Sequence, residues 1–212
     1  MLIDVSYHEG RINWCKVREK GVDEAYIRFA TGYGRGAGDP AFFRNCELAQ
    51  AAGMVWNVYH VPALADPDVQ AQADCYADTL KLLHKHVGLA YRALEGPMGD
   101  WEAFAKLLAR QNRPLALRYW DSVTQAISHP LGTYTRASWW DSKIGAAGFE
   151  GESKLWVAHP GAVRPTIPRA WRDLGLSWSI WQYSWNGRVY GVPGAVDLNH
   201  RRADWDAAHP DG

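Results

Sequence analysis

The feature that most constrains the fold is a regular alternation of short apolar runs and helical stretches in the first 95 residues. Apolar runs typical of strands occupy residues 2–6, 25–30, 54–60 and 88–95. Stretches with helical spacing lie between them, at residues 13–20, 39–53 and 66–83. Strands that alternate with helices over short connections form parallel sheets through right-handed crossovers. This part of the chain therefore predicts an α/β fold with a parallel sheet.

The rest of the chain is poorer in helices. Residues 101–110 predict a helix, and residues 114–128 fit either a strand or a helix. We favour a helix for the second stretch, because a crossover is needed before the strand expected at residues 133–135. Further strands are expected at residues 154–158, 177–183 and 195–198, separated by glycine and proline. The prediction is one α/β barrel domain over residues 1–212 with a β-rich C-terminal third.

Three acidic residues lie in or beside these apolar runs, although they are far apart in the sequence. They are Asp4, Glu95 and Asp197. Acids at the ends of barrel strands usually converge on one face, where catalytic residues sit in such folds. Two convergent carboxylates are the usual equipment for cleaving a glycosidic bond. Each acid also has a structural reading, because Asp4 and Asp197 could cap a turn, and Glu95 could pair with an arginine such as Arg92 or Arg118.

Charge, cysteine and histidine content argue against several classes of function. The 23 basic and 23 acidic side chains cancel, which argues against a nucleic-acid partner. No run of 18 apolar residues and no signal-like segment at the N-terminus are present, so we expect no membrane span. The 3 cysteines are widely spaced and the 8 histidines lack the spacing of metal ligands, so we expect no metal and no cofactor.

Aromatic side chains are unusually frequent, with 12 tryptophans and 10 tyrosines. Tryptophan is largely buried on average and can fill the core of a small barrel. Aromatic planes also stack on the C–H faces of sugar rings. We expect most tryptophans, including Trp14 and Trp120, to be structural and a few to line a glycan groove.

Several segments together resemble glycoside hydrolase family 25, the Chalaropsis-type lysozymes. The opening IDVSYHEGRINWCKVREKGVDEAYIRFATG at residues 3–32 is similar to the start of that family. Five later segments follow in the family's order: AGMVWNVYH at 52–60, GTYTRASWWD at 132–141, LWVAHPG at 155–161, SIWQYSW at 179–185 and AVDLNH at 195–200. Residues 97–130 match poorly, while the rest of the chain is covered.

The resemblance implies a modified TIM-like barrel of eight strands with fewer helices than the standard fold. It also implies cleavage of the β-1,4 bond between N-acetylmuramic acid and N-acetylglucosamine in peptidoglycan. The family's first-strand Asp matches Asp4, its C-terminal Asp matches Asp197, and the Glu of its Asp-x-Glu motif, the expected acid/base, matches Glu95. The aromatic residues of the family's groove fall on Tyr59, Tyr134, Trp156 and Trp181.

One position departs from the family in this alignment, because the first Asp of Asp-x-Glu falls on Ala93. Loss of that carboxylate would weaken catalysis, although the substrate's own 2-acetamido group can replace an enzyme nucleophile. If the alignment is wrong, another acid fills the role, and Asp100 is the candidate.

Three functions follow from these observations. The first is a muramidase weakened by Ala93, the second is a non-catalytic glycan-binding module, and the third is a glycosidase for another N-acetylated polymer. We expect a monomer without a separate wall-binding module, with peptidoglycan strands as its partner. A phage lysin, a phage tail component and an exported bacterial enzyme are equally compatible with the sequence.

Overall fold

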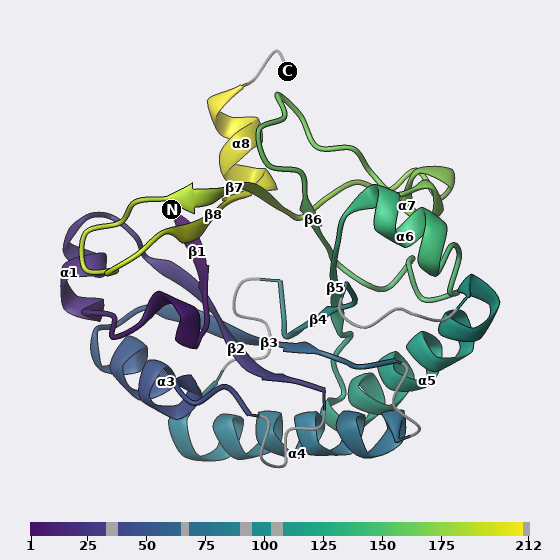
Figure 1. Ribbon diagram of the computed structural model, residues 1–212, viewed down its shortest axis with the longest axis horizontal. Helices are drawn as coiled ribbons and strands as arrows, with labels where there is room; N and C mark the ends of the chain where they lie inside the picture. The colour runs from purple at the N-terminus through teal and green to yellow at the C-terminus, as the bar shows by residue number, and fades with distance from the viewer. Residues whose placement is uncertain (33–37, 65–67, 90–94, 103–107, 210–212) are drawn as a thin grey trace.

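A computed structural model of the protein describes residues 1–32, 38–64, 68–89, 95–102 and 108–209. Within these ranges, eight strands close into a barrel in sequence order (Figure 1). Neighbouring strands from β1 to β7 run parallel, whereas β8 is antiparallel to both β7 and β1. The strands are β1 (Leu2–Val5), β2 (Glu24–Thr31), β3 (Val55–Val61), β4 (Met98–Asp100), β5 (Gly132–Thr135), β6 (Leu155–Ala158), β7 (Ile180–Gly187) and β8 (Val196–Arg201).

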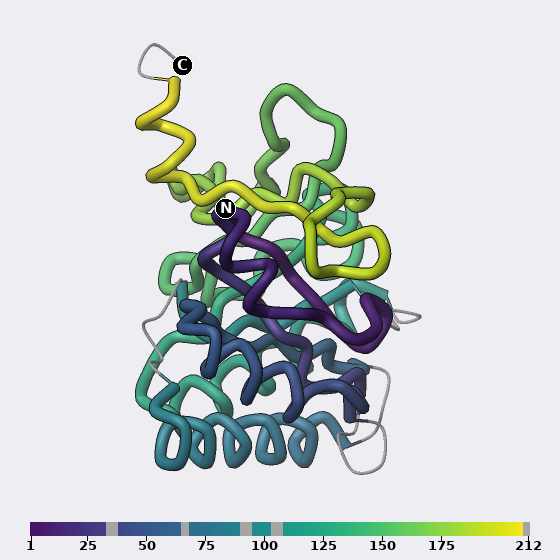
Figure 2. The backbone as a smooth tube through the Cα atoms, turned by 90° about the vertical axis from the view of Figure 1, so that its left-hand side faces the viewer, coloured from purple at the N-terminus to yellow at the C-terminus, as the bar shows by residue number. Residues whose placement is uncertain are grey.

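Helices lie on the outside of the barrel (Figure 1). They are the 3-10 helix η1 (Tyr7–Glu9) and the α-helices α1 (Trp14–Glu19), α3 (Phe42–Ala51), α4 (Val69–Val87), α5 (Ala109–Ile127), α6 (Ala137–Lys143), α7 (Arg169–Asp173) and α8 (Arg202–Ala208). The long helices α4 and α5 pack against each other, and α4 forms one outer edge of the molecule (Figure 2). Both described ends of the chain lie near β8 (Figure 1).

Local sequence signals set several helix boundaries. The side chain of Asn13 accepts a hydrogen bond from the backbone N–H of Lys16 and caps α1. Asp68 caps α4 in the same way, and Gly88 ends that helix in the left-handed conformation that glycine adopts without steric cost. The start expected for this helix, at residues 66–67, lies outside the described residues.

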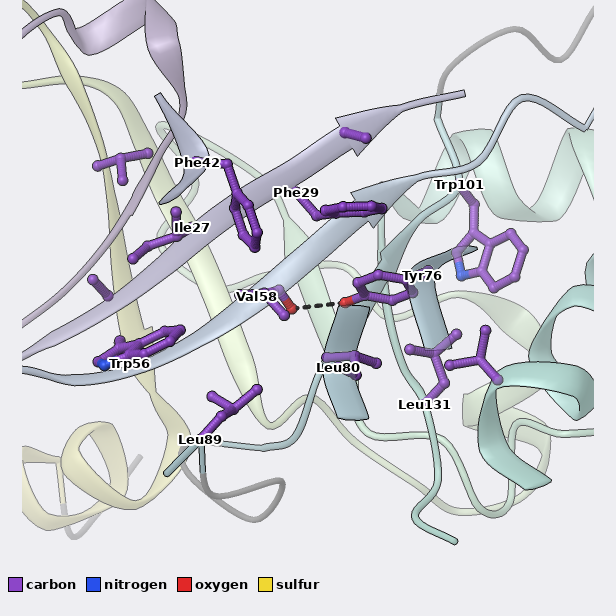
Figure 3. Close-up of a cluster of buried hydrophobic side chains, with 14 of the residues drawn as sticks. Ile27, Phe29, Phe42, Trp56, Val58, Tyr76, Leu80, Leu89, Trp101 and Leu131 are labelled. Carbon is purple, nitrogen blue, oxygen red and sulfur yellow. Dashed lines mark hydrogen bonds between the residues drawn. The ribbon is translucent and has the colours of Figure 1, made fainter. Parts of the chain in front are cut away.

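The main hydrophobic core fills the space between the strands and the helices. Phe29, Val58, Tyr76, Leu80 and Trp101 belong to it (Figure 3). The Tyr76 hydroxyl donates a hydrogen bond of 3.0 Å to the carbonyl of Val58, which ties α4 to β3 (Figure 3). Trp14 and Trp120 are also buried there, 1% and 5% exposed, which confirms that both are structural.

A second, smaller core lies inside the barrel. Its buried members are Leu2, Tyr26, Met98, Trp156 and Ile180. They come from strands around the ring, because side chains at alternate positions of each strand point inward. This inner core closes the barrel as a packed interior, so a substrate site can form only at an end of it.

The expected fold class is confirmed: the chain forms an α/β barrel of eight strands with short helices in its last third. The run at residues 88–95 is not the fourth strand of the barrel, and residues 90–94 of it lie outside the described residues. The fourth strand is Met98–Asp100, which pairs with β3 on one side and β5 on the other. The helix expected at residues 101–110 is also wrong at its start, because Trp101 and Glu102 form a turn. The helix favoured for residues 114–128 is confirmed as part of α5.

None of the helices in the described part of the chain combines the length and the apolar character needed to cross a membrane.

Candidate active site

Two carboxylates face each other across β1 and β8. Asp4 and Asp197 are register partners, and Asp197 lies near the start of the antiparallel β8. The start of β8 is therefore at the same end of the barrel as the C-terminal ends of the parallel strands. The side-chain amide of Gln182 donates hydrogen bonds to both acids, at 3.1 Å to each, and the amide of Asn199 donates to Asp4 at 2.8 Å.

The Asp4–Asp197 pair holds its protons more tightly than free carboxyl groups do. Burial raises the pKa of both residues, and the charge of Asp4 raises the pKa of Asp197 further. Two close carboxylates in a poorly solvated place cannot both ionise freely. We therefore expect the pair to share a proton near neutral pH.

Aromatic side chains fix the amides that contact these acids. The Tyr134 hydroxyl and the indole N–H of Trp185 each donate to the Gln182 carbonyl at 2.8 Å. The indole N–H of Trp156 donates to the Asn199 carbonyl at 2.7 Å. Because both amide oxygens are occupied by donors, the amide nitrogens point at the carboxylates. This hydrogen-bond network thus fixes the orientation of the Asp4 and Asp197 carboxyl groups.

A second acidic element follows β4. Asp100 is the last residue of that strand, and its carboxylate accepts a 3.0 Å hydrogen bond from the backbone N–H of Glu102. Burial raises the pKa of Asp100 to about 7, and the charges of Glu102 and Asp4 act in the same direction. Asp100 is the register partner of Tyr134, whose hydroxyl donates to the same Gln182 that binds Asp4 and Asp197, so the β4 acids lie at the same end of the barrel as the β1–β8 pair.

Glu102 is held mainly by Arg136, the residue that follows β5. The Arg136 backbone N–H donates to Glu102 Oε1, and the Arg136 guanidinium Nε lies 2.6 Å from Glu102 Oε2. Thr135 adds a weaker hydroxyl contact of 3.4 Å. The Glu102 side chain is only 14% exposed, whereas that of Arg136 is 45% exposed. Glu102 is therefore an anchored carboxylate at the rim of the acidic cluster.

Glu95 does not join this cluster, and its expected place in the same cleft is wrong. Its carboxylate lies 3.3 Å from the Arg201 guanidinium, which also binds Glu24 at 2.9 Å. Glu24 is the first residue of β2, and Arg201 pairs with Ile180, the first residue of β7. Glu95 thus lies at the N-terminal end of the barrel, opposite to the acids. The alternative interpretation of Glu95 is a pair with an arginine such as Arg92 or Arg118; the structure shows such a pair, with Arg201 as the partner.

Three of the four expected groove aromatics lie at the acidic end or directly beneath it. Burial and the nearby charges of Asp4 and Asp100 raise the pKa of the Tyr59 hydroxyl. Tyr134 contacts Gln182, and Trp156 packs against both tyrosines with only 1% of its surface exposed. Trp156 is therefore the floor of the site, where it orients other groups without offering an open face.

Trp181 lies elsewhere, so its expected place in the groove is wrong. It neighbours Gln182 in β7, and successive strand residues point to opposite faces. Its ring packs outside the barrel against Trp178, His200 and Trp205, and it is 2% exposed. Trp185 is instead the exposed aromatic at the acidic end, with 46% of its surface accessible.

The sequence contains an Asp-x-Glu motif at these acids. It consists of Asp100, Trp101 and Glu102 and begins at the last residue of β4. The apolar run at residues 88–95 resembles a strand, so the family's Asp-x-Glu motif aligns with Ala93 and Glu95. Ala93 lies outside the described residues. The alternative named for this role, Asp100, is the acid at the barrel end.

Replacing Asp100 with asparagine should increase stability at alkaline pH. The folded protein keeps a proton on Asp100 up to about pH 7, whereas the ordinary value is 3.8. The free energy of unfolding therefore falls as pH rises between these values, because the folded state binds the extra proton. Asp100→Asn should flatten part of this decline and raise the free energy of unfolding at pH 8 by at least about 1 kcal/mol.

Urea unfolding at pH 4.5, 6 and 8 measures this effect, with exposed Asp173→Asn on α7 as the control. An equal pH slope for Asp100→Asn and the unaltered protein would show that Asp100 is solvated like an ordinary carboxylate.

Within the described ranges, no group of three or more His, Cys, Asp or Glu side chains is arranged to hold a metal ion. The candidate site thus consists of carboxylates, amides and aromatic rings, with Arg136 and Arg28 as its nearby cations.

Comparisons with known proteins agree with this architecture. The sequence profile of Glycosyl hydrolases family 25 matches residues 3–192. Lysozyme M1 of Streptomyces globisporus is 32% identical over 93% of this chain and 66% of its own length. YegX of Escherichia coli K12 is 28% identical over 93% of this chain and 67% of its own length. This chain thus spans about two thirds of the length of these relatives.

Solved structures give the same result. A bacterial lysozyme from Streptomyces coelicolor has a TM-score of 0.79 and 30% identity, covering 94% of this chain and 90% of its own. A family GH25 lysozyme from Aspergillus fumigatus, at 23% identity, has a TM-score of 0.74 and covers 97% of this chain and 96% of its own, which supports the fold. The family match over most of the chain confirms the resemblance noted in the sequence: this chain belongs to glycosyl hydrolases family 25.

Proposed function

We propose that the chain is a muramidase that cleaves the β-1,4 bond between N-acetylmuramic acid and N-acetylglucosamine in peptidoglycan. The observation that carries the proposal is the convergence of Asp4, Asp100, Glu102 and Asp197 at the C-terminal end of the barrel. Paired carboxyl groups are what glycoside hydrolysis requires. The family membership and the lysozyme names of two relatives support the same substrate class.

In this proposal, Glu102 is the general acid and Asp100 its partner. Glu102 gives a proton to the leaving glycosidic oxygen, and after bond cleavage it takes a proton from the attacking water. Positive charge develops on the sugar ring in the transition state, so Asp100 would stabilise it in its ionised form, which predominates above about pH 7. The carboxyl of Asp100 can also orient the 2-acetamido group, whose oxygen attacks the anomeric carbon.

Asp4 and Asp197 take a supporting role. Because they share a proton near neutral pH, one oxygen can donate a hydrogen bond to the sugar while the others accept. Gln182 and Asn199 fix their orientation. The pair is thus suited to hold sugar hydroxyl or acetamido groups next to the scissile bond.

The position of the Asp-x-Glu motif makes a non-catalytic or weakened protein a poorer explanation than an active enzyme. The non-catalytic binding module rested on Ala93, and Asp100 and Glu102 supply both carboxylates that the family motif contains. We therefore propose a competent catalytic site instead of a weakened one. A glycosidase for another N-acetylated polymer would use the same acids, so only the substrate distinguishes it.

Lysis of purified bacterial walls tests the proposal. The protein should lower the turbidity of a wall suspension and leave a chitin suspension nearly unchanged under the same conditions. Clearing of chitin alone would favour the other glycosidase. Co-sedimentation of the protein with the walls, without a fall in turbidity, would favour the binding module.

A further inference from the structure

The contact between Glu102 and Arg136 raises a problem for the proposed acid. The Arg136 guanidinium Nε lies 2.6 Å from Glu102 Oε2, and Glu102 Oε1 accepts from the Arg136 backbone N–H, so both carboxyl oxygens are occupied. A general acid must instead present a protonated oxygen to the glycosidic oxygen when the bond breaks. The Arg136 guanidinium therefore has to leave Glu102 when the substrate binds, and it needs a new anionic partner to do so at low cost.

The structure offers a place for that partner. Arg136 lines a pocket of about 450 Å³ together with Ser138, His159, Thr166 and Trp185. The Arg136 side chain is 45% exposed, so its guanidinium can turn without breaking a buried core. The backbone N–H of Arg136 also holds Glu102, and this contact can persist after the guanidinium turns away.

Two residues that line the pocket also contact the acidic cluster. Trp185 donates to the same Gln182 that binds Asp4 and Asp197. Arg136 binds Glu102. A sugar that lies over the acids can therefore extend a substituent into the pocket. The cation and the hydroxyl groups lining it suit a carboxylate, and the ring of Trp185 suits the adjoining sugar or methyl surface.

We propose that Arg136 binds a carboxylate carried by the muramic acid unit, and that this transfer of its guanidinium releases Glu102 for catalysis. The inference rests on the proposed muramidase function and adds a source of specificity to it. N-acetylmuramic acid differs from N-acetylglucosamine by a lactyl ether, which ends in a carboxylate or in a peptide that carries carboxylates. A neutral chitin strand lacks such a group and leaves Arg136 on Glu102.

Binding measurements test the proposal without depending on turnover. Calorimetry would compare the N-acetylglucosamine–N-acetylmuramic acid disaccharide with its lactyl methyl ester, which has nearly the same shape but no charge. The unaltered protein should bind the acid about tenfold more tightly, since a charge-assisted hydrogen bond of this kind is commonly worth that factor. A third ligand, the disaccharide carrying a dipeptide, tells whether a peptide carboxylate can replace the lactyl one.

Variants at Arg136 complete the test. Arg136→Gln should remove the preference for the acid over its ester, and Arg136→Lys should restore part of it because the charge returns without the planar geometry. Arg172→Gln, on the exposed surface of α7, is the control and should keep the preference. If Arg136→Gln weakens the binding of acid and ester equally, or weakens neither, Arg136 is a structural residue and the proposal is wrong.

Hydrolysis separates this inference from the proposed function. Arg136→Gln should lower the rate on walls and raise the rate on a neutral chitooligosaccharide, because the guanidinium no longer occupies Glu102 Oε2. Equal losses on both substrates would overturn the release role. Absence of wall hydrolysis by the unaltered protein would instead overturn the muramidase assignment, while the binding comparison would still decide whether Arg136 selects the carboxylate.

Discussion

Glu102→Gln is expected to lower the rate of wall lysis by about 10²–10⁴-fold, because an amide cannot give a proton to the leaving oxygen. The variant should keep the fold, since glutamine has nearly the same shape and its carbonyl can still accept hydrogen bonds from Arg136. Turbidity assays on purified walls measure the rate, and the thermal unfolding midpoint checks the fold.

Glu95→Gln is the matched control for this result. Glu95 lies at the other end of the barrel against Arg201, and that contact is partly exposed to solvent. Its loss should reduce stability by no more than about 1 kcal/mol and leave the rate of lysis within about twofold. A large loss of lysis in Glu95→Gln together with normal lysis in Glu102→Gln would reverse the proposed roles.

Trp101→Ala is expected to cost about 3–5 kcal/mol of unfolding free energy, as large-to-small changes at buried aromatic residues do. Trp101 is fully buried between Asp100 and Glu102 in sequence, and its ring contacts Tyr119, Trp140 and Phe149. Its backbone N–H donates to the Tyr134 carbonyl at 3.3 Å, and its indole N–H lies 3.3 Å from the Thr133 hydroxyl.

The position of Trp101 links stability to the site. The side chain anchors the turn from which both acids of the Asp-x-Glu motif project, so its removal should also lower the rate of lysis in the folded fraction. Trp101→Phe should recover most of the stability because it refills much of the cavity. Urea unfolding provides the measurement, and a cost below about 1 kcal/mol for Trp101→Ala would mean that the turn is held by its backbone alone.

The barrel could be predicted because most strands combine an apolar run with clear boundary signals. Residues 25–30 and 54–60 lie within one residue of β2 and β3 at each end. Residues 154–158 similarly cover β6. Both faces of these strands are buried, one in the barrel interior and the other against the helices. Their sequences are therefore apolar at nearly every position.

The fourth strand could not be predicted in the same way. Met98–Asp100 has three residues, and both Gly99 and Asp100 have low strand propensity. Its strand conformation comes from pairing with β3 and β5, which both lie far from it in the sequence. The run at residues 88–95 is more strand-like, so the sequence predicts the fourth strand there and places the Asp-x-Glu position on Ala93 and Glu95.

The acids of β1 and β8 were easier to predict than the acids of β4. Asp4 and Asp197 lie within specific, well-matched segments, and the structure brings them together as register partners. Trp181 shows the limit of such matching, because a one-residue difference in a strand decides whether a ring faces the site or the outer core. Its neighbour Gln182 occupies the inward position.

The soluble fragments released from purified peptidoglycan test the proposed activity most directly. After borohydride reduction and mass spectrometry, the new reducing ends should be N-acetylmuramic acid, and Glu102→Gln should release almost none of them. New reducing ends of N-acetylglucosamine, or the release of peptides without any new reducing ends, would contradict the assignment of this barrel as a muramidase.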